Sequence, residues 1–190
     1  MKMKKVLSCV AAGLMACALV AGCGGEKKQS VVKIGFLAPI TGGNSGLGVG
    51  LKNSAELAVK QANESGKYPY KFELVVADDA SDPSTAVSAA NKLIANKDIV
   101  AVAGHFNSTC ALATAPVFHK NQTPLMVIAA IHPGITANGY KEVNRVISPS
   151  HVQGIVSGKQ AATEFNVKTI CLINDRTDYG KNNAALFAEN

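Results

Sequence analysis

The segment VAVAGHFNSTCALATAP, residues 100–116, shows the change of pattern from which the fold can be predicted. An apolar run ends at Gly104, a short polar segment follows, and an alanine-rich run begins, which predicts a strand, a loop and a helix. Asn107, Ser108 and Thr109 then lie at the helix start, where backbone N–H groups are unpaired and the dipole favours a negative group. This segment therefore predicts a site for a ligand carboxylate. The alternative is that Ser108 or Asn107 simply caps the helix, the commonest use of such residues.

The same alternation of strand and helix continues along the chain. We expect strands over residues 31–38, 71–77, 99–104, 124–130 and 167–174, with a short extended piece over 143–147. We expect helices over residues 47–64 and 152–165, after the caps Asp82 and Ser108, and from about Tyr179. Pro116 should kink or split the helix that contains it. Hydrophobic strands separated by helices predict a doubly wound parallel α/β sheet, whose ligands bind outside the carboxyl ends of the strands.

The first residues are typical of an export signal. Three lysines within the first five residues precede an apolar run over residues 6–20, which is too short to span a bilayer stably. The tetrapeptide Val-Ala-Gly-Cys at 20–23 resembles the lipobox of bacterial lipoproteins. We therefore expect residues 1–22 to be a signal peptide, Cys23 to be lipidated, and residues 23–30 to form a flexible tether. The protein would be anchored on the extracytoplasmic face of a membrane, in the periplasm or at the cell surface.

Composition and spacing exclude several classes of protein. The chain has 190 residues, enough for one good core but short of two complete domains. Its formal charge of +6 falls to +3 without the three signal-peptide lysines, and no basic stripe interleaved with aromatics remains, so nucleic acid is not an expected partner. Cys110 and Cys171 lie in apolar runs outside any CxxC or metal spacing, so we expect buried thiols and no disulfide.

Histidines, acids and glycines give no catalytic or cofactor motif. The histidines lack metal-ligand spacing, although His105 and His132, at strand ends, could line a ligand cleft. Asp78 and Asp79 are expected to make loop and turn contacts rather than to act as paired acids. The segment GLGVG at 46–50 lacks the third glycine of a dinucleotide fingerprint. A serine hydrolase would need a GxSxG elbow around the nucleophile, which HFNSTC lacks. We therefore expect no enzyme, no metal and no cofactor.

Six segments together resemble the lipoprotein-type solute receptors of ABC importers, specifically the branched-chain amino-acid (Leu/Ile/Val) binding family. They are KIGFLAPITG (33–42), ADDASDP (77–83), VAVAGHFNS (100–108), PLMVIAAIHPGIT (124–136), SPSHVQG (148–154) and NDRTDYG (174–180).

This resemblance implies a type I periplasmic-binding-protein fold, with two lobes that close on a small ligand and present it to a membrane permease and ATPase. It assigns residues 31–149 to most of the first lobe and residues 150–190 to the start of the second. The last predicted helix has no stop signal before Asn190, so we expect the chain to be a fragment. A ligand-sensing lobe of a signalling receptor would have the same fold and is the alternative.

The resemblance also assigns candidate ligand contacts. Ser108 corresponds to the hydroxyl that holds the ligand carboxylate, Ala129 to a backbone contact, and Tyr179 to the aromatic that covers the ligand from the second lobe. The other candidate ligand-binding residues are Asn107, Thr109, Ala130, Ile131 and Leu47.

Three features depart from the family pattern. Ile131 stands where a Ser or Thr hydroxyl is common, and Leu47 stands where an aromatic is common. A hydrogen bond to a charged group is worth ~1.5 to 3 kcal/mol, so the missing hydroxyl favours a ligand other than a standard amino acid, such as an amide or an aromatic acid. The acid that pairs with the ligand ammonium would lie beyond Asn190. Ser81 and Asn107 occupy the positions of the first-lobe disulfide, which is therefore absent.

Overall fold

The computed structural model describes residues 29–165 and 168–190. The predicted signal peptide, Cys23 and most of the tether lie outside these residues. Within the described part of the chain, no helix has both the length and the apolar character needed to cross a membrane.

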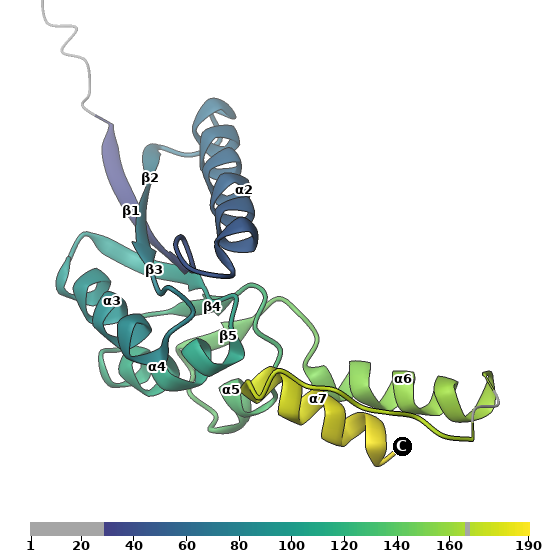
Figure 1. Ribbon diagram of the computed structural model, residues 1–190. Helices are drawn as coiled ribbons and strands as arrows, with labels where there is room; N and C mark the ends of the chain where they lie inside the picture. The colour runs from purple at the N-terminus through teal and green to yellow at the C-terminus, as the bar shows by residue number, and fades with distance from the viewer. Residues whose placement is uncertain (1–28, 166–167) are drawn as a thin grey trace, which may run out of the picture.

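The strands form one sheet in which every neighbouring pair is parallel. They are β1 Ser30–Ala38, β2 Tyr70–Asp78, β3 Ile99–Gly104, β4 Leu125–Val127 and β5 Val143–Arg145. Their order across the sheet is β2-β1-β3-β4-β5 (Figure 1), so the chain moves from β1 first to one side and then, at β3, to the other. This confirms the predicted parallel α/β sheet.

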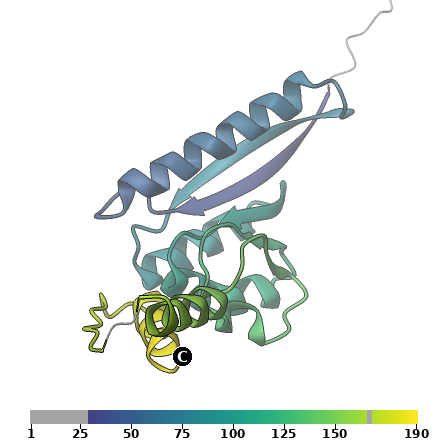
Figure 2. The ribbon, with the colours of Figure 1, turned by 90° about the vertical axis from the view of Figure 1, so that its right-hand side faces the viewer.

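The described part of the chain also forms helices, of which the first three cover the two faces of the sheet (Figure 2). The helices are α2 Ser45–Glu64, α3 Pro83–Ala95, α4 Ser108–Lys120, α5 Gly134–Ala137, α6 Ser150–Thr163 and α7 Asp178–Ala188. Figure 2 shows α2 lying lengthwise along β1 and β2, while α3 and α4 pack together on the other face. Asp82 begins α3 as predicted, because its carboxylate accepts from Thr85 N (2.7 Å) and Pro83 occupies the first turn.

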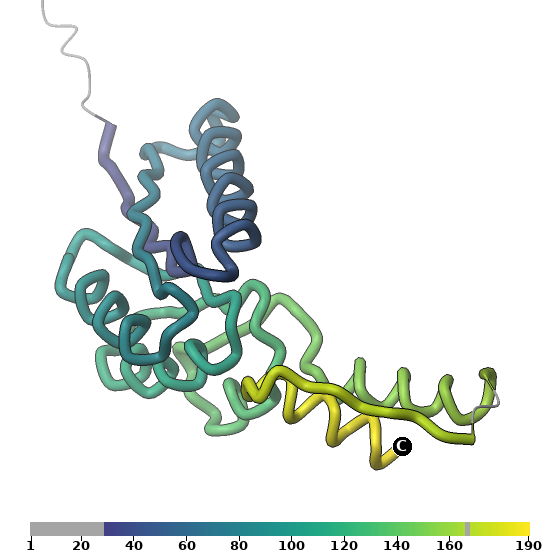
Figure 3. Tube along the Cα trace, in the orientation of Figure 1, coloured from purple at the N-terminus to yellow at the C-terminus, as the bar shows by residue number. Residues whose placement is uncertain are grey.

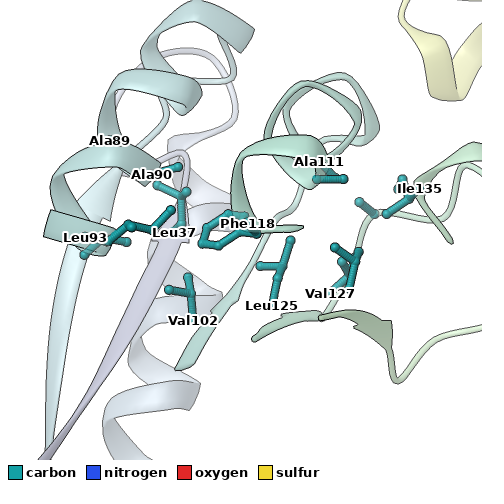
Figure 4. Close-up of a cluster of buried hydrophobic side chains, with 14 of the residues drawn as sticks. Leu37, Ala89, Ala90, Leu93, Val102, Ala111, Phe118, Leu125, Val127 and Ile135 are labelled. Atoms are coloured by element: carbon teal, nitrogen blue, oxygen red, sulfur yellow. The ribbon is translucent and has the colours of Figure 1, made fainter. Parts of the chain in front are cut away.

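The main core lies between the sheet and helices α3 and α4. Leu37, Val102 and Leu125 from three strands meet Leu93 and Phe118 from the two helices (Figure 4), and none is more than 4% exposed. Full burial of one such side chain contributes roughly 1.5–3 kcal/mol. This core fixes the carboxyl ends of β1, β3 and β4 relative to one another.

Helix α4 continues through Pro116, so the predicted split does not occur. A proline inside a helix removes one backbone hydrogen bond and costs ~3 kcal/mol or more. Pro116 faces solvent, whereas Ala115 and Phe118 on the adjacent turns are buried. Packing of the flanking turns therefore offsets the lost bond.

The predicted strand over residues 167–174 is wrong for its described part, since residues 168–175 form no strand. A strand requires hydrogen bonds to a neighbour, and none of the described strands pairs with this segment. Its apolar side chains are accordingly uncovered: Ile173 is 91% exposed. Cys171 is exposed rather than buried as predicted, whereas Cys110 is buried and both thiols are free.

Helices α6 and α7 pack on each other beside the carboxyl end of the sheet. Gly154 and Gly158 on α6 allow close approach, since a Cβ on either would press against α7 or the residues that follow it. Figure 3 shows the chain after α6 running back toward the sheet, where α7 begins. The start of α7 therefore lies near the loops that follow the strands.

Candidate ligand-binding site

A cavity of about 420 Å³ opens where the loops after β1, β3 and β4 meet the start of α7. Its lining residues are Asn44, Phe106, Asn107, Ser108, Thr109, Ala129, Ile131, Ile147, Asp175, Thr177 and Tyr179. The order of the sheet reverses between β1 and β3, and parallel α/β sheets bind ligands outside the carboxyl ends of the strands at such a point. The cavity is therefore at the place that the fold favours for a ligand.

Helix α4 begins at this cavity without a side-chain cap. Asn107 occupies the N-cap position, but its side chain makes no capping hydrogen bond. Its Oδ1 instead accepts from the Ser81 hydroxyl at 2.9 Å. The side chain of Asn107 therefore does not cap the helix, in contrast to the alternative considered from the sequence. The uncapped first turn retains backbone donors and the positive end of the helix dipole for an anionic group.

Ser108 is oriented by the loop after β4. The side chain is 3% exposed, and its Oγ accepts from His132 N at 3.2 Å. A hydroxyl has one proton and two acceptor lone pairs, so this contact leaves the Ser108 proton for an acceptor in the cavity. A carboxylate oxygen is such an acceptor.

Three residues of the loop after β4 were predicted to contact the ligand, and two of them line the cavity. Ala129 and Ile131 line the cavity, whereas Ala130 is fully buried beneath it and donates its N–H to the His105 carbonyl at 3.1 Å. Leu47, predicted from the first loop, is 57% exposed and does not belong to the lining. Ligand contacts by these residues stay predictions.

The opposite wall comes from the residues that begin α7. Thr177 caps the helix by accepting from Gly180 N at 3.0 Å. Asp175 Oδ1 accepts from the Thr177 hydroxyl (2.7 Å) and from Thr177 N (3.0 Å), and these hydrogen bonds lower the pKa of Asp175. Tyr179 lies in the first turn and is 37% exposed. This wall is anchored by its own capping contacts, which leaves Tyr179 accessible at the cavity.

Two hydrogen bonds join this wall to the residues around it. Asp178 N donates to Thr109 Oγ1 at 3.4 Å, and the Ser150 hydroxyl donates to Asn182 Oδ1 at 2.6 Å. The first bond links the starts of α4 and α7 directly. The cavity is thus closed on two sides by elements that contact each other.

A buried polar array supports the site from beneath. Asp79 Oδ2 contacts His105 Nδ1 at 2.9 Å, and His105 Nε2 contacts Thr114 Oγ1 at 2.8 Å; all three side chains are fully buried. His105 and His132 are not among the lining residues of this cavity, although both lie at strand ends from which they could have reached a cleft. His105 is instead a core residue that ties the loops after β2 and β3 to α4.

The two acids after β2 make loop contacts, as predicted. Asp78 Oδ1 accepts from Ile40 N (2.8 Å) and Ala80 N (2.8 Å). Burial raises the pKa of Asp78, but hydrogen bonds from the Thr41 hydroxyl and from the backbone outweigh this effect and lower it. Asp79 Oδ1 accepts from Ser81 N at 3.0 Å. Both carboxylates therefore shape the turn rather than face the cavity.

Sequence reasoning missed five lining residues: Asn44, Phe106, Ile147, Asp175 and Thr177. The last two lie in the segment NDRTDYG, from which only Tyr179 was assigned a contact. Phe106 stands between Gly104 and Asn107, so the loop that contains it was identified although the residue was not. Asn44 lies three residues before Leu47, in the same first loop. Ile147 follows β5, and no local pattern indicates that this end of the sheet reaches the cavity.

Comparison with known proteins identifies the family. A sequence model described as a periplasmic binding protein matches residues 31–190. The chain belongs to the periplasmic binding protein family. Leu/Ile/Val-binding protein homolog 2 of Brucella abortus is 33% identical over 180 residues, 94% of this chain and 47% of that protein. The leucine-, isoleucine-, valine-, threonine- and alanine-binding protein of Pseudomonas aeruginosa is 32% identical over 79% of this chain and 40% of its own length.

Solved periplasmic binding proteins share the fold. LivJ of Streptococcus pneumoniae, in complex with isoleucine, has a TM-score of 0.78 at 26% identity over 84% of this chain and 46% of that chain. A solute-binding protein of Rhodopseudomonas palustris, in complex with 3,4-dihydroxybenzoic acid, has a TM-score of 0.74 at 27% identity over 84% of this chain and 43% of its own. The chain thus spans about half the length of the periplasmic binding proteins it matches.

The comparisons confirm the predicted family and fold. The family is one of solute-binding proteins rather than enzymes, which agrees with the expectation drawn from the sequence motifs. Membership of the family also implies an extracytoplasmic location.

Proposed function

We propose that this chain is part of the solute receptor of an ABC importer and binds a small carboxylate-bearing solute, an amino acid or a related acid. The observation that carries this proposal is the uncapped start of α4 beside the free proton of Ser108, at a cavity that Tyr179 bounds from the other side. Backbone donors, a hydroxyl and the helix dipole together favour a carboxylate there. Periplasmic binding proteins named for amino-acid binding are similar to this chain over most of its length.

Residues 31–149 form the first lobe in this proposal and residues 150–190 the start of the second. The solute would bind between the lobes and stabilise the closed form through its higher affinity for that form. Closure would then present a surface to the permease and ATPase. The alternative function is that of a sensor lobe, in which the same closure would act on a signalling partner. A permease and an ATPase encoded beside this gene would favour transport over sensing.

A lipid anchor at Cys23 would hold the receptor at the membrane. The sequence supports this anchor through the charged start, the short apolar run and the lipobox-like residues 20–23. Each buried methylene of an acyl chain contributes ~0.8 kcal/mol, so two chains anchor stably. Palmitate labelling of the wild type that is absent in Cys23→Ala tests the anchor.

The lining of the cavity supports an acid with an apolar body. Similar proteins have been solved with isoleucine and with 3,4-dihydroxybenzoic acid, and both ligands carry a carboxylate. Ile131, Ile147 and Phe106 give this cavity an apolar side that suits an aliphatic or an aromatic body. An amide is the third class, and it would lack the charge that α4 favours.

The Ser108→Ala variant tests the carboxylate site. A thermal-shift screen of the full natural protein with L-leucine, L-isoleucine, 3,4-dihydroxybenzoate and urea first identifies a ligand. Calorimetry with that ligand should show affinity at least tenfold lower in Ser108→Ala, because a hydrogen bond to a charged group is worth ~1.5 to 3 kcal/mol.

The matched control is Ser88→Ala, whose hydroxyl lies on the exposed face of α3 and bonds only within that helix. Its affinity should equal that of the wild type. Unchanged affinity in Ser108→Ala would remove Ser108 from the site, and stabilisation by urea but by none of the acids would refute a carboxylate ligand.

A further inference from the structure

Three loops are joined by side chains at one end of the cavity. Asn44 Nδ2 donates to Ser81 Oγ at 2.9 Å, and Ser81 Oγ donates to Asn107 Oδ1 at 2.9 Å. All three residues are partly buried, and both asparagines line the cavity. The loops after β1, β2 and β3 therefore meet in one continuous chain of hydrogen bonds.

This chain fixes the orientation of both amide groups. Ser81 has one hydroxyl proton, which it gives to Asn107, so its oxygen is the acceptor for Asn44. Asn44 consequently keeps its Oδ1 free and Asn107 keeps its Nδ2 free. Both residues are N-cap residues, of α2 and α4, yet neither side chain caps its helix.

The two free amide atoms are accessible. Within the described residues, the buried side-chain polar atoms that lack a partner are Arg145 Nη1 and Asn183 Oδ1. The free oxygen of Asn44 and the free nitrogen of Asn107 are not among them and have no partner in the described part of the chain, so both are open to solvent at a cavity that their residues line. Asn44 Oδ1 is thus a fixed acceptor and Asn107 Nδ2 a fixed donor, and both can bind a ligand.

The two amides bond to the same serine oxygen, so their free acceptor and free donor belong to neighbouring groups. Such a pair matches a group that itself donates and accepts, and a hydroxyl is the smallest such group. Asn107 is the direct neighbour of Ser108, so this pair lies a few ångströms from the proposed carboxylate position. Among the other lining residues, Phe106 and Ile131 are apolar and offer a hydroxyl no partner. Three other polar lining residues already hydrogen-bond at the start of α7: Thr109, Asp175 and Thr177.

We propose that Asn44, Ser81 and Asn107 form a hydroxyl-recognition subsite, which selects among carboxylate solutes those with a hydroxyl close to the carboxylate. The inference rests on the proposed function, since it assumes that a carboxylate binds at Ser108. Asn44 and Asn107 contact the hydroxyl, and Ser81 acts as a positioning residue that fixes the two amides. A solute without the hydroxyl leaves both amide atoms without a ligand partner and binds more weakly.

Matched pairs of probes test the subsite in the full natural protein. L-Threonine and L-valine are close in shape and differ in one hydroxyl, and 3-hydroxybenzoate and benzoate form the corresponding aromatic pair. Calorimetry should show that the hydroxylated member of at least one pair binds about tenfold more tightly. In Asn44→Leu and Ser81→Ala this ratio should fall to about one, because affinity for the hydroxylated member falls more than affinity for the hydroxyl-free member.

The outcomes separate the two levels of the proposal. If the wild type binds neither these probes nor the acids of the thermal-shift screen, the carboxylate function fails and the subsite fails with it. If it binds an acid of that screen but none of the four probes, the subsite alone is refuted. If the wild type binds both members of a pair equally, or if the variants keep the wild-type ratio, the subsite alone is refuted. Thermal unfolding verifies that each variant is folded. If Asn44→Leu does not fold, Ser81→Ala alone tests the subsite, because this substitution removes only one hydroxyl group. Ser88→Ala should keep the full ratio.

Discussion

Asn44 and Asn107 show how a side chain's partner, rather than its type, determines its role. Asparagine at a helix start is usually a cap, yet both amides bind Ser81 and leave two helices without side-chain caps. Asp82 differs from both asparagines, because its carboxylate caps α3 by accepting from Thr85 N. The uncapped α4 retains donors for a ligand, whereas the capped α3 contributes stability.

The cap of α3 predicts a specific pH dependence. Hydrogen bonds from the Ser84 hydroxyl (2.6 Å), then from Thr85 N (2.7 Å) and Oγ1 (2.8 Å), lower the pKa of Asp82 to about 2. Because this pKa is depressed on folding, its contribution to stability is complete above the ordinary value of 3.8 and is lost as the pH falls through about 2.

We expect Asp82→Asn to be less stable than the wild type at pH 7, with the difference shrinking between about pH 4 and pH 2. Urea midpoints at these pH values measure the difference. A difference that stays constant over this range would contradict the assignment.

Single residues also show what the sequence could predict. Ser108, Thr109 and Tyr179 were identified from a helix start and from family resemblance, and the structure brings them to one cavity. His105 was considered a possible cleft residue because it follows a strand, but the buried Asp79 carboxylate requires a partner and the imidazole supplies it in the core. Such pairings depend on residues far apart in the sequence, so local patterns do not reveal them.

Strands β1 and β3 approach closely at the cavity, and Gly104 permits this approach. Leu37 and Gly104 are register partners, and a Cβ on Gly104 would collide with the Leu37 carbonyl oxygen. The elements of the sheet were predictable because their apolar runs are buried. The strand over residues 167–174 was not, because strand formation needs a neighbour that periodicity cannot supply.

We expect Gly104→Ala to lower the free energy of unfolding by ~1–3 kcal/mol, since overpacking forces the two strands apart. Solute affinity should fall as well, because the strands carry the loops of the cavity. Gly50→Ala is the matched control: its position in α2 is open, and alanine should be neutral or stabilising by up to ~1 kcal/mol. Urea unfolding of both variants measures the effect, and wild-type stability in Gly104→Ala would contradict the close approach.

At the scale of the whole molecule, the main core and the cavity are built from different parts of the chain. Every member of the main core cluster lies between Leu37 and Val143. The cavity, by contrast, needs Asp175, Thr177 and Tyr179 from beyond that core. Folding of the sheet and completion of the site are therefore separable.

A fragment of residues 29–149 tests this separation. We expect it to unfold cooperatively in urea, because it retains the entire main core cluster. It should bind solutes more weakly than the longer chain, since one wall of the cavity is missing. A non-cooperative transition with exposed hydrophobic surface, detected by dye binding, would show that residues after 149 are needed for the core.

The hydrogen bond between Ser81 and Asn107 has a consequence for the redox conditions under which the loops keep their geometry. A cystine at these positions would tie the loops together only in the presence of an oxidant, and a reductant would release them. The hydroxyl–amide bond is indifferent to both. Cys110, the thiol nearest the loops, is buried, and burial followed by the charges of Asp79 and Asp82 raises its pKa to about 12, so it stays protonated and unreactive. The loops that line the cavity should therefore keep the same geometry in aerated and in anaerobic media.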